Sequence, residues 1–233
     1  MMQAQFVAAP VAPRVTVLDV RRQSMKNYNY LVVDPATMQA VIVDPAWELE
    51  KLDAAVAESR ASLAGVLVTH SHRDHIDLAA AMSEKYRCPV WMPAAEIAAS
   101  GFDTPRLQAI ATTPWVVGAM RIEPIFTPGH TPGSTCYLIG ENLFTGDVLF
   151  AEGCGLCPDL EAAYAMFESL ERIKSRTGPH IRVFPGHSYG QPPGRPMSQL
   201  MRENIYLQFS SRESFAAFRM RSGQDRARLF NFS

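Results

Sequence analysis

Three histidines and an aspartate lie within six consecutive positions, in the stretch T-H-S-H-R-D-H that ends at His75. The stretch directly follows an apolar run at residues 63–68, which predicts a buried strand. In an extended loop, side chains two positions apart point the same way, so His70 and His72 can face one cation. Asp74 and His75 follow at the turn into a helix and can face a position next to that cation. Imidazole and carboxylate groups together suit zinc, iron or manganese.

Three further strand-like runs each end in a turn and a potential ligand. They are residues 121–127, 141–145 and 181–184, followed respectively by P-G-H at His130, G-D at Asp147 and P-G-H at His187. Rigid scaffolds place functional groups on such strand-end loops. Seven ligands exceed what one tetrahedral ion takes, and they suit two ions that share a carboxylate at a spacing of about 3.5–4 Å. The sixth histidine, His180, lacks this context and is interpreted as structural.

The remaining periodic segments predict the elements that position these loops. We expect a hairpin of strands 29–34 and 40–44, helices over 48–60, 76–86 and 161–174, and a buried strand at 63–68. The order of strand, loop and helix indicates an α/β arrangement. The stretch Q-P-P-G-R-P at 191–196 predicts a linker before a final piece with helical and irregular parts.

Composition narrows the class of protein. The chain has 233 residues, of which 47% are hydrophobic and 19% charged, and its net charge of −1 gives no case for binding nucleic acid or membranes. No apolar run approaches the roughly 20 residues of a membrane span. The first 14 residues lack a basic segment and predict a flexible tail rather than a signal peptide. Four cysteines without regular spacing favour a reducing, cytoplasmic location, and C-G-L-C at 154–157 lacks the context of a redox pair or zinc site.

The motifs together resemble the metallo-β-lactamase superfamily. They are T-H-S-H-R-D-H, P-G-H-T-P-G-S, F-T-G-D and the final P-G-H, with landmarks spread over residues 27–189. The resemblance implies an α/β (α+β) fold, an αββα sandwich of two mixed β-sheets flanked by helices, with the metals at one edge. It implies a domain at 15–190 and a short C-terminal extension at 191–233 that packs on the same domain.

The resemblance also assigns the ligands of two divalent ions, for which zinc is favoured and iron or manganese are alternatives. The first ion takes His70, His72 and His130, the second takes Asp74, His75 and His187, and Asp147 bridges them. Asp44 stands where relatives have an aspartate that supports the site, and a plain turn is the alternative interpretation.

The predicted chemistry is hydrolysis by a bridging hydroxide. Two Lewis-acidic ions lower the pKa of a shared water from 15.7 towards roughly 7. Asp74 is the predicted catalytic residue, because its carboxylate can accept a hydrogen bond from that hydroxide and orient it. A thiolate leaving group, with a thiol pKa near 8.5, needs little protonation, so an activated acyl compound such as a thioester is the expected substrate.

Within the superfamily, N-Y-N-Y-L-V at 27–32 and F-T-G-D-V-L-F-A-E-G-C-G at 144–155 resemble glyoxalase II, which hydrolyses S-lactoylglutathione. Tyr189 matches a glutathione-contacting tyrosine, with a half-buried aromatic beside the site as the alternative. Leu156 replaces a lysine of that group, and only 46 residues follow His187, fewer than in its C-terminal domain. The persulfide dioxygenases share G-C-G but continue with an arginine that is missing here.

A closer resemblance is to the glyoxalase-II-like zinc hydrolases encoded with bacterial polyketide assembly lines. It rests on E-G-C-G-L-C, G-H-S-Y-G-Q-P-P-G and the segment E-N-I-Y-L-Q-F-S-S-R-E-S-F. It implies removal of acyl groups from acyl carrier protein or pantetheine. Glyoxalase II activity, persulfide oxidation, lactone hydrolysis and a non-catalytic metal-binding role are the alternatives.

The C-terminal segment is basic. From residue 195 onwards it contains seven arginines, no lysine and three acids, a net charge of +4. Carrier proteins are acidic, so we expect a docking surface formed by Arg202, Arg212, Arg219 and Arg221. Solvated surface arginines are the alternative interpretation.

Overall fold

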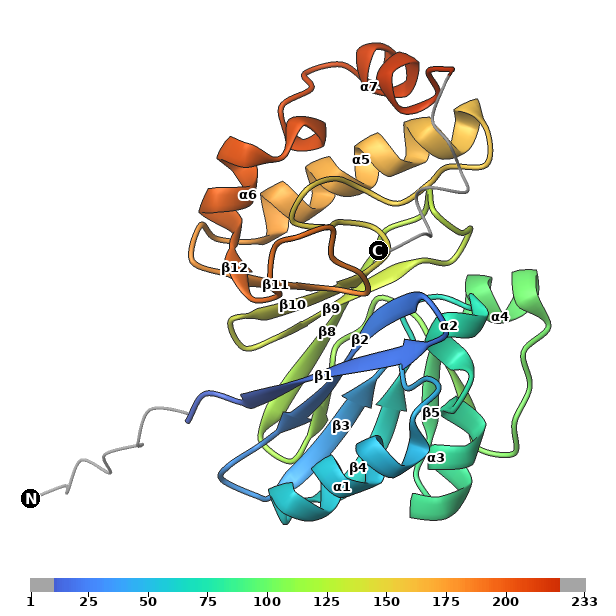
Figure 1. Ribbon diagram of the computed structural model, residues 1–233, viewed down its shortest axis with the longest axis vertical. Coiled ribbons are helices and arrows are strands. Elements are labelled where there is room, and N and C mark those ends of the chain that lie inside the picture. The colour runs from blue at the N-terminus through green and yellow to red at the C-terminus, as the bar shows by residue number, and fades with distance from the viewer. Residues whose placement is uncertain (1–10, 223–233) are drawn as a thin grey trace, which may run out of the picture.

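Two six-stranded β-sheets pack face to face, and helices cover the outer face of each (Figure 1). The computed structural model describes residues 11–222. This four-layer arrangement is the predicted αββα sandwich with two mixed sheets. Among the described residues, no helix is long and apolar enough to cross a membrane.

The first sheet contains the predicted hairpin. Its strands, in spatial order, are β1 (Arg14–Arg22), β2 (Met25–Val33), β3 (Gln39–Val43), β4 (Ser62–Leu67), β5 (Val90–Pro93) and β6 (Leu107–Ile110). Neighbours from β1 to β3 are antiparallel, and those from β3 to β6 are parallel. Parallel neighbours need crossover connections, and helices α1 (Leu49–Ser59) and α3 (Ala79–Tyr86) supply two of them.

The second sheet is mostly antiparallel. Its strands, in spatial order, are β12 (Arg195–Pro196), β11 (Arg182–Pro185), β10 (Asn142–Gly146), β9 (Thr135–Ile139), β8 (Met120–Phe126) and β7 (Trp115–Val117). Only β10 and β11 run parallel, and they are connected through the long helix α5 (Leu160–Arg176). The sequence analysis predicted this helix at 161–174 and strands near β8, β10 and β11, and all four are confirmed.

The strands near the middle of the sandwich are buried on both faces. In β2, Tyr30 and Val32 pack between the two sheets, whereas Leu31 and Val33 point towards the helices outside the first sheet. Side chains alternate between the two faces of a strand, so an unbroken apolar run is what a doubly covered strand requires. This explains why the strand runs in the sequence lack a polar face.

Two buried tyrosines join the sheets directly below the loops that carry the predicted ligands. The Tyr30 hydroxyl donates to the carbonyl of Pro185, two residues before His187. From the opposite sheet, the Tyr137 hydroxyl donates to the carbonyl of Val68 at 2.8 Å, two residues before His70. A buried carbonyl without a partner costs about 1–3 kcal/mol, so these bonds favour one placement of each strand end.

The C-terminal segment packs on α5. It forms α6 (Met197–Glu203), the 3₁₀ turn η1 (Ile205–Leu207) and α7 (Arg212–Arg219), whose apolar side chains Met197, Leu200, Leu207 and Phe215 join the core under the second sheet. Asn204 donates to the carbonyls of Phe150 and Gly153 at 3.0 and 2.9 Å, which ties the segment to a loop near the ligands. Residues 223–233 of the predicted extension lie outside the described residues.

The structure corrects several predicted boundaries. Most of the predicted tail at 1–14 lies outside the described residues, and β1 already begins at Arg14. The predicted linker at 191–196 ends in β12, which pairs with β11. The predicted helix 76–86 is two helices, α2 (Arg73–Ile76) and α3, because the Leu78 amide bonds to the Pro45 carbonyl at 3.0 Å instead of continuing α2.

Candidate metal centre

All seven predicted ligands lie together at one edge of the sandwich. They come from the loops that follow β4, β8, β10 and β11 and from the short helix α2, which carries Asp74 and His75. Their ligand atoms form two groups, each within 4.8 Å: His70, His72, His130 and Asp147 in the first group, and Asp74, His75 and His187 in the second. A third group of this size joins His70 and His75 to the buried carboxylate of Asp44. This division matches the one that the sequence resemblance implied, although ligation itself stays a prediction.

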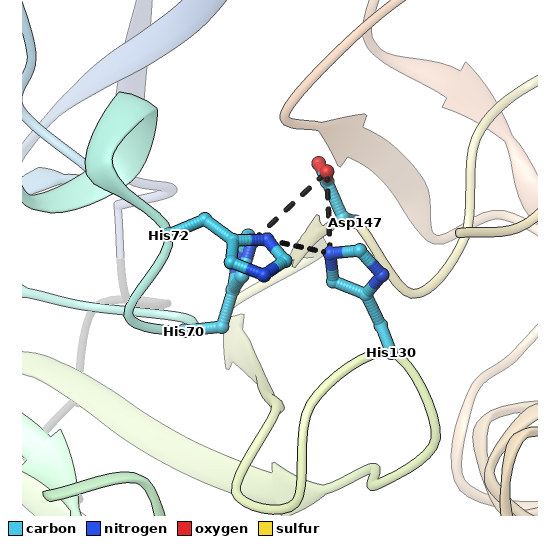
Figure 2. A group of neighbouring side chains, drawn as sticks. All are labelled: His70, His72, His130 and Asp147. Atoms are coloured by element: carbon cyan, nitrogen blue, oxygen red, sulfur yellow. Dashed lines mark hydrogen bonds and ion pairs between the residues drawn. The ribbon is translucent and has the colours of Figure 1, made fainter. Parts of the chain in front are cut away.

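The first group is closely spaced (Figure 2). His72 Nδ1 lies 3.1 Å from His70 Nε2 and 3.0 Å from His130 Nε2. Asp147 Oδ2 lies 3.6 Å from His130 Nε2 and 4.0 Å from His70 Nε2. Two nitrogen ligands on one tetrahedral zinc, each at about 2.0–2.1 Å, stand about 3.3 Å apart, so this spacing suits one such ion.

The second group adjoins the first through Asp147. Asp74 Oδ2 lies 3.2 Å from His187 Nε2 and 3.5 Å from His75 Nε2. Asp147 Oδ1 lies 3.4 Å from His75 Nε2, and Asp147 Oδ2 lies 3.3 Å from His187 Nε2. The Asp147 carboxylate therefore contacts histidines of both groups, as a bridging ligand must.

Four of the five imidazoles have their second ring nitrogen next to an oxygen of the protein. The Nδ1 atoms of His70, His75, His130 and His187 lie beside Thr69 Oγ1 (3.1 Å), Asp44 Oδ2 (3.0 Å), the Leu156 carbonyl (2.8 Å) and the Lys26 carbonyl (3.1 Å), respectively. An Nδ1–H that donates to such an oxygen leaves the Nε2 lone pair directed into the cluster. Metal-binding histidines have this arrangement almost without exception.

Two buried atoms in the cluster need a positively charged partner. His75 Nε2 and Asp147 Oδ1 are buried, and neither has a hydrogen-bond partner among residues 11–222. A buried polar atom without a partner costs about 1–3 kcal/mol, and a metal ion at this point would satisfy both. The donor set of imidazoles and carboxylates therefore fits a pair of divalent cations.

The electrostatics of the two groups differ. Burial, together with the imidazoles of His75, His130 and His72, lowers the pKa of His70 well below its ordinary value, so the ring is neutral and its lone pair is free for a ligand bond. Burial also lowers the pKa of His75, but the carboxylates of Asp147, Asp74 and Asp44 outweigh it and raise that pKa to about 9, so a cation that binds His75 Nε2 would have to displace a proton from the ring. The second group thus concentrates negative charge, which attracts a cation.

Asp44 supports the site rather than forming only a turn. The residue is buried, and its Oδ1 accepts the Thr69 amide at 2.8 Å. Its Oδ2 accepts the Thr69 hydroxyl at 2.6 Å and lies beside His75 Nδ1. One carboxylate therefore orients His75 directly and His70 through the threonine hydroxyl, which agrees with the supporting interpretation of the sequence.

The sequence analysis did not identify two buried residues that contact the ligand loops. Asn27 Nδ2 donates to the Asp74 carbonyl at 2.6 Å and to Asp74 Oδ2 at 3.2 Å. Glu96, on helix α4 (Ala94–Ser100), contacts the loops that carry His72 and His130. Asn27 lay within a motif that was quoted only for its resemblance, whereas nothing in the local pattern around Glu96 marks it.

Glycine is required where the loops meet. A Cβ atom at Gly186 would lie 2.5 Å from His75 Cε1 and 2.6 Å from Asp147 Oδ1. A Cβ atom at Gly155 would lie 1.9 Å from the Asp147 carbonyl oxygen. The motifs P-G-H at 185–187 and G-C-G at 153–155 therefore bring backbone directly against predicted ligand residues, an approach that only glycine allows.

The predicted substrate and partner residues lie outside the cluster. Tyr189 is 41% exposed, and its ring packs at 5.4 Å on Phe150, whose ring lies 6.1 Å from His187. Arg202, Arg212 and Arg221 are exposed on the C-terminal segment. Arg219, in contrast, is only 6% exposed and donates to the Tyr206 hydroxyl, so little of its side chain is available to a docking partner.

The remaining histidine and the cysteines have no place in the cluster. His180 is an exposed residue 3.9 Å from Glu141, and it precedes β11 at the end of that strand opposite His187. All four cysteines are buried and have free thiols. Burial raises the pKa of Cys157 to about 11, which disfavours the reactive thiolate and agrees with a structural role.

Comparison with known proteins identifies close relatives. BaeB of Bacillus velezensis, named a probable polyketide biosynthesis zinc-dependent hydrolase, is 42% identical over 90% of this chain and 93% of its own. PksB of Bacillus subtilis, named in the same way, is 40% identical over 91% of this chain and 95% of its own. A hydroxyacylglutathione hydrolase of Rhodopseudomonas palustris is 35% identical over 70% of this chain and 63% of its own.

Solved structures and a family model agree on the fold. A metallo-beta-lactamase from Staphylococcus aureus superposes with a TM-score of 0.81 at 22% identity, over 91% of this chain and 67% of its own. ETHE1 from Myxococcus xanthus superposes with a TM-score of 0.77 at 30% identity, over 92% and 94%. The model of the metallo-beta-lactamase superfamily matches residues 26–187, which include all seven clustered ligands. The chain therefore belongs to the metallo-beta-lactamase superfamily and is similar to zinc-dependent hydrolases of polyketide biosynthesis.

Proposed function

We propose that this protein is a thioester hydrolase with two zinc ions that removes acyl groups from acyl carrier protein or pantetheine during polyketide biosynthesis. The observation that carries the proposal is the pair of ligand groups that share Asp147, in a chain that matches BaeB and PksB over nearly their whole length. When bound, the ions would supply Lewis acidity, which polarises a thioester carbonyl and lowers the pKa of water so that hydroxide is present at neutral pH to attack it.

The side chains of this protein hold the reacting groups in place. Asp74 is the more exposed of the two clustered carboxylates, at 17% of its side chain against 8% for Asp147. We assign to the Asp74 carboxylate the role of the hydrogen-bond acceptor that orients the attacking water. Asn27 donates to Asp74 Oδ2 and to the Asp74 carbonyl, so it fixes the rotamer that this role requires.

Glutathione thioesters are the alternative substrates. Similarity to the hydroxyacylglutathione hydrolase of Rhodopseudomonas palustris supports this alternative. The Tyr189 ring packs on Phe150, which in turn lies next to His187, so Tyr189 is close enough to the second ligand group to contact a substrate bound there. However, that relative extends well beyond the region matched by this chain, which covers 63% of it. The carrier-bound substrate is better supported, because BaeB and PksB match 90% and 91% of this chain and more than nine tenths of their own length.

The experiment that tests the proposal measures thiol release by the zinc-loaded protein from two substrates side by side. One is an acyl group on a carrier protein, the other is S-lactoylglutathione, and the Asp74→Ala variant provides the blank for each. We expect a higher kcat/KM for the carrier-bound acyl group. A preference for S-lactoylglutathione would instead support the glutathione alternative, and zinc-loaded protein without activity on either would contradict the proposal.

The exposed arginines suggest how a carrier protein would dock. Arg202, Arg212 and Arg221 lie on one exposed segment, and their guanidinium groups would meet the acidic surface of a carrier. Arg212 also lies 3.0 Å from Glu213, so part of its charge is already neutralised within the segment. Attraction between exposed charges acts mainly on the rate of encounter and is screened by salt.

Raising the salt concentration is therefore expected to lower kcat/KM for the carrier-bound acyl group much more than for a small acyl-pantetheine thioester. The two substrates share the reacting bond and differ only in the protein that carries it, so the small thioester is the control. The measurement is kcat/KM for both between low and high ionic strength. Equal salt dependence for the two substrates would refute docking through these arginines.

A further inference from the structure

The carboxylate of Glu96 is fully buried between two loops and accepts four hydrogen bonds. Its Oε1 accepts from the Ser71 amide at 2.8 Å and from the Ser71 hydroxyl at 2.5 Å. Its Oε2 accepts from the Thr131 hydroxyl and from the Gly133 amide, both at 2.8 Å. Every acceptor position of the carboxylate is thus directed at one loop or the other.

These two loops carry the three imidazoles of the first ligand group. Ser71 lies between His70 and His72 in the loop after β4, which belongs to the first sheet. Thr131 directly follows His130 in the loop after β8, which belongs to the second sheet. The planar carboxylate of Glu96 therefore joins the loop that carries His70 and His72 to the loop that carries His130. The separation of these two loops sets the spacing of the three imidazoles.

The loop after β8, which carries His130, packs closely against the backbone of Glu96. A Cβ atom at Gly133 would lie 2.2 Å from the backbone nitrogen of Glu96 and 2.5 Å from its Cα. The loop consequently packs directly on the backbone of α4, and only glycine allows this approach. The position of His130 relative to α4 is set both by this contact and by the hydrogen bonds of the carboxylate.

We propose that Glu96 is a positioning residue for the first metal ion. It fixes the distance between the His70–His72 pair and His130, and thereby sets the affinity of the first ligand group without touching the ion. The inference rests on the proposed metal-dependent function. It predicts that loss of Glu96 weakens one of the two ions selectively, which a residue important only for folding would not do.

Asp34 provides a matched control. It is a buried carboxylate that accepts hydrogen bonds from the Ala36 amide at 3.0 Å, the Thr37 hydroxyl at 2.5 Å and the Ala119 amide at 2.6 Å. It therefore also joins loops of the two sheets. None of its partners belongs to a ligand loop, so Asp34→Asn disturbs a similar network without reaching the metal centre.

The experiment is a zinc titration of the full chain in competition with a chromophoric chelator. Glu96→Gln replaces one acceptor oxygen by an amide that can only donate, so the hydrogen bonds to one of the two loops are lost. We expect it to weaken one of the two zinc-binding steps by about 10–100-fold, the usual effect of removing a group that orients ligands. Asp34→Asn is expected to leave both steps unchanged.

Two further variants identify the weakened step and guard against misfolding. His72→Ala removes a ligand of the first group, and combining it with Glu96→Gln should not weaken the remaining step further, because both changes act on one ion. Ser71→Ala removes a single hydroxyl bond to Oε1 and leaves Glu96 in place. It should weaken the same step to a smaller degree, which tests the inference even if Glu96→Gln does not fold.

Three results would overturn the inference. They are unchanged zinc binding in Glu96→Gln and Ser71→Ala, equal weakening of both steps, and the same loss in Asp34→Asn. If the wild-type protein binds two zinc ions in any of these cases, the proposed function survives and only the role of Glu96 is refuted. Wild-type protein that binds no zinc would refute both.

Discussion

Replacing Asp74 by alanine is expected to lower kcat for thioester hydrolysis by about 10²–10⁴-fold, the range attributed to a positioned proton acceptor. Asp74 Oδ2 lies 3.2 Å from His187 Nε2 and accepts from Asn27, so the carboxylate is held at the second ligand group with one face towards solvent. Without it, the attacking water loses the acceptor that orients it. Steady-state kinetics with a carrier-bound acyl group provide the measurement.

Asp77→Ala is the matched control for this prediction. Asp77 lies three positions further along the chain, and its carboxylate is 3.8 Å from the exposed Arg22 rather than near the ligand cluster. An exposed ion pair contributes little, so the variant should hydrolyse thioesters at the wild-type rate. Wild-type kcat in the Asp74→Ala protein would show that another group orients the water.

Replacing Asp147 by alanine is expected to abolish most of the stabilisation that zinc gives to the folded protein. Both ligand groups contact this carboxylate, so neither ion keeps its full ligand set. An ion that binds only the folded state adds about 4 kcal/mol at a free concentration of 1,000 times its dissociation constant. The measurement is the free energy of unfolding by denaturant, with and without zinc, in wild-type and Asp147→Ala protein.

Asp159→Ala separates loss of zinc from general destabilisation. The Asp159 side chain accepts the Ala162 amide at 2.8 Å and caps helix α5. Removing this cap should cost about 1 kcal/mol with or without zinc, so the increment due to zinc should remain. If Asp147→Ala also retains the full increment, Asp147 is not shared by the two ions.

The ligand loops were predictable because each follows a strand whose sequence is distinctive. The run at 63–68 precedes the first histidines, and P-G-H stands in the loops after the strand runs 121–127 and 181–184. In the structure, these loops meet at one edge of the sandwich, although β4 belongs to the first sheet and β8, β10 and β11 belong to the second. Local patterns were sufficient here because strand and turn preferences both depend on residues close in sequence.

Long-range contacts account for what the sequence did not reveal. Helix 76–86 was predicted as continuous, but the amide of Leu78 bonds to the carbonyl of Pro45, a partner 33 positions away that no periodicity could indicate. No element was predicted within residues 88–118, yet they form β5, β6, β7 and the short helix that carries Glu96. Burial of a charged side chain such as Glu96 depends on donors from two other loops.

The central claim is that seven side chains hold two metal ions, and zinc-edge anomalous diffraction from crystals of the zinc-loaded protein tests it most directly. Two peaks are expected. One should lie among His70, His72 and His130, the other among Asp74, His75 and His187, with Asp147 adjacent to both. A single peak at saturating zinc, or peaks away from these residues, would contradict the account.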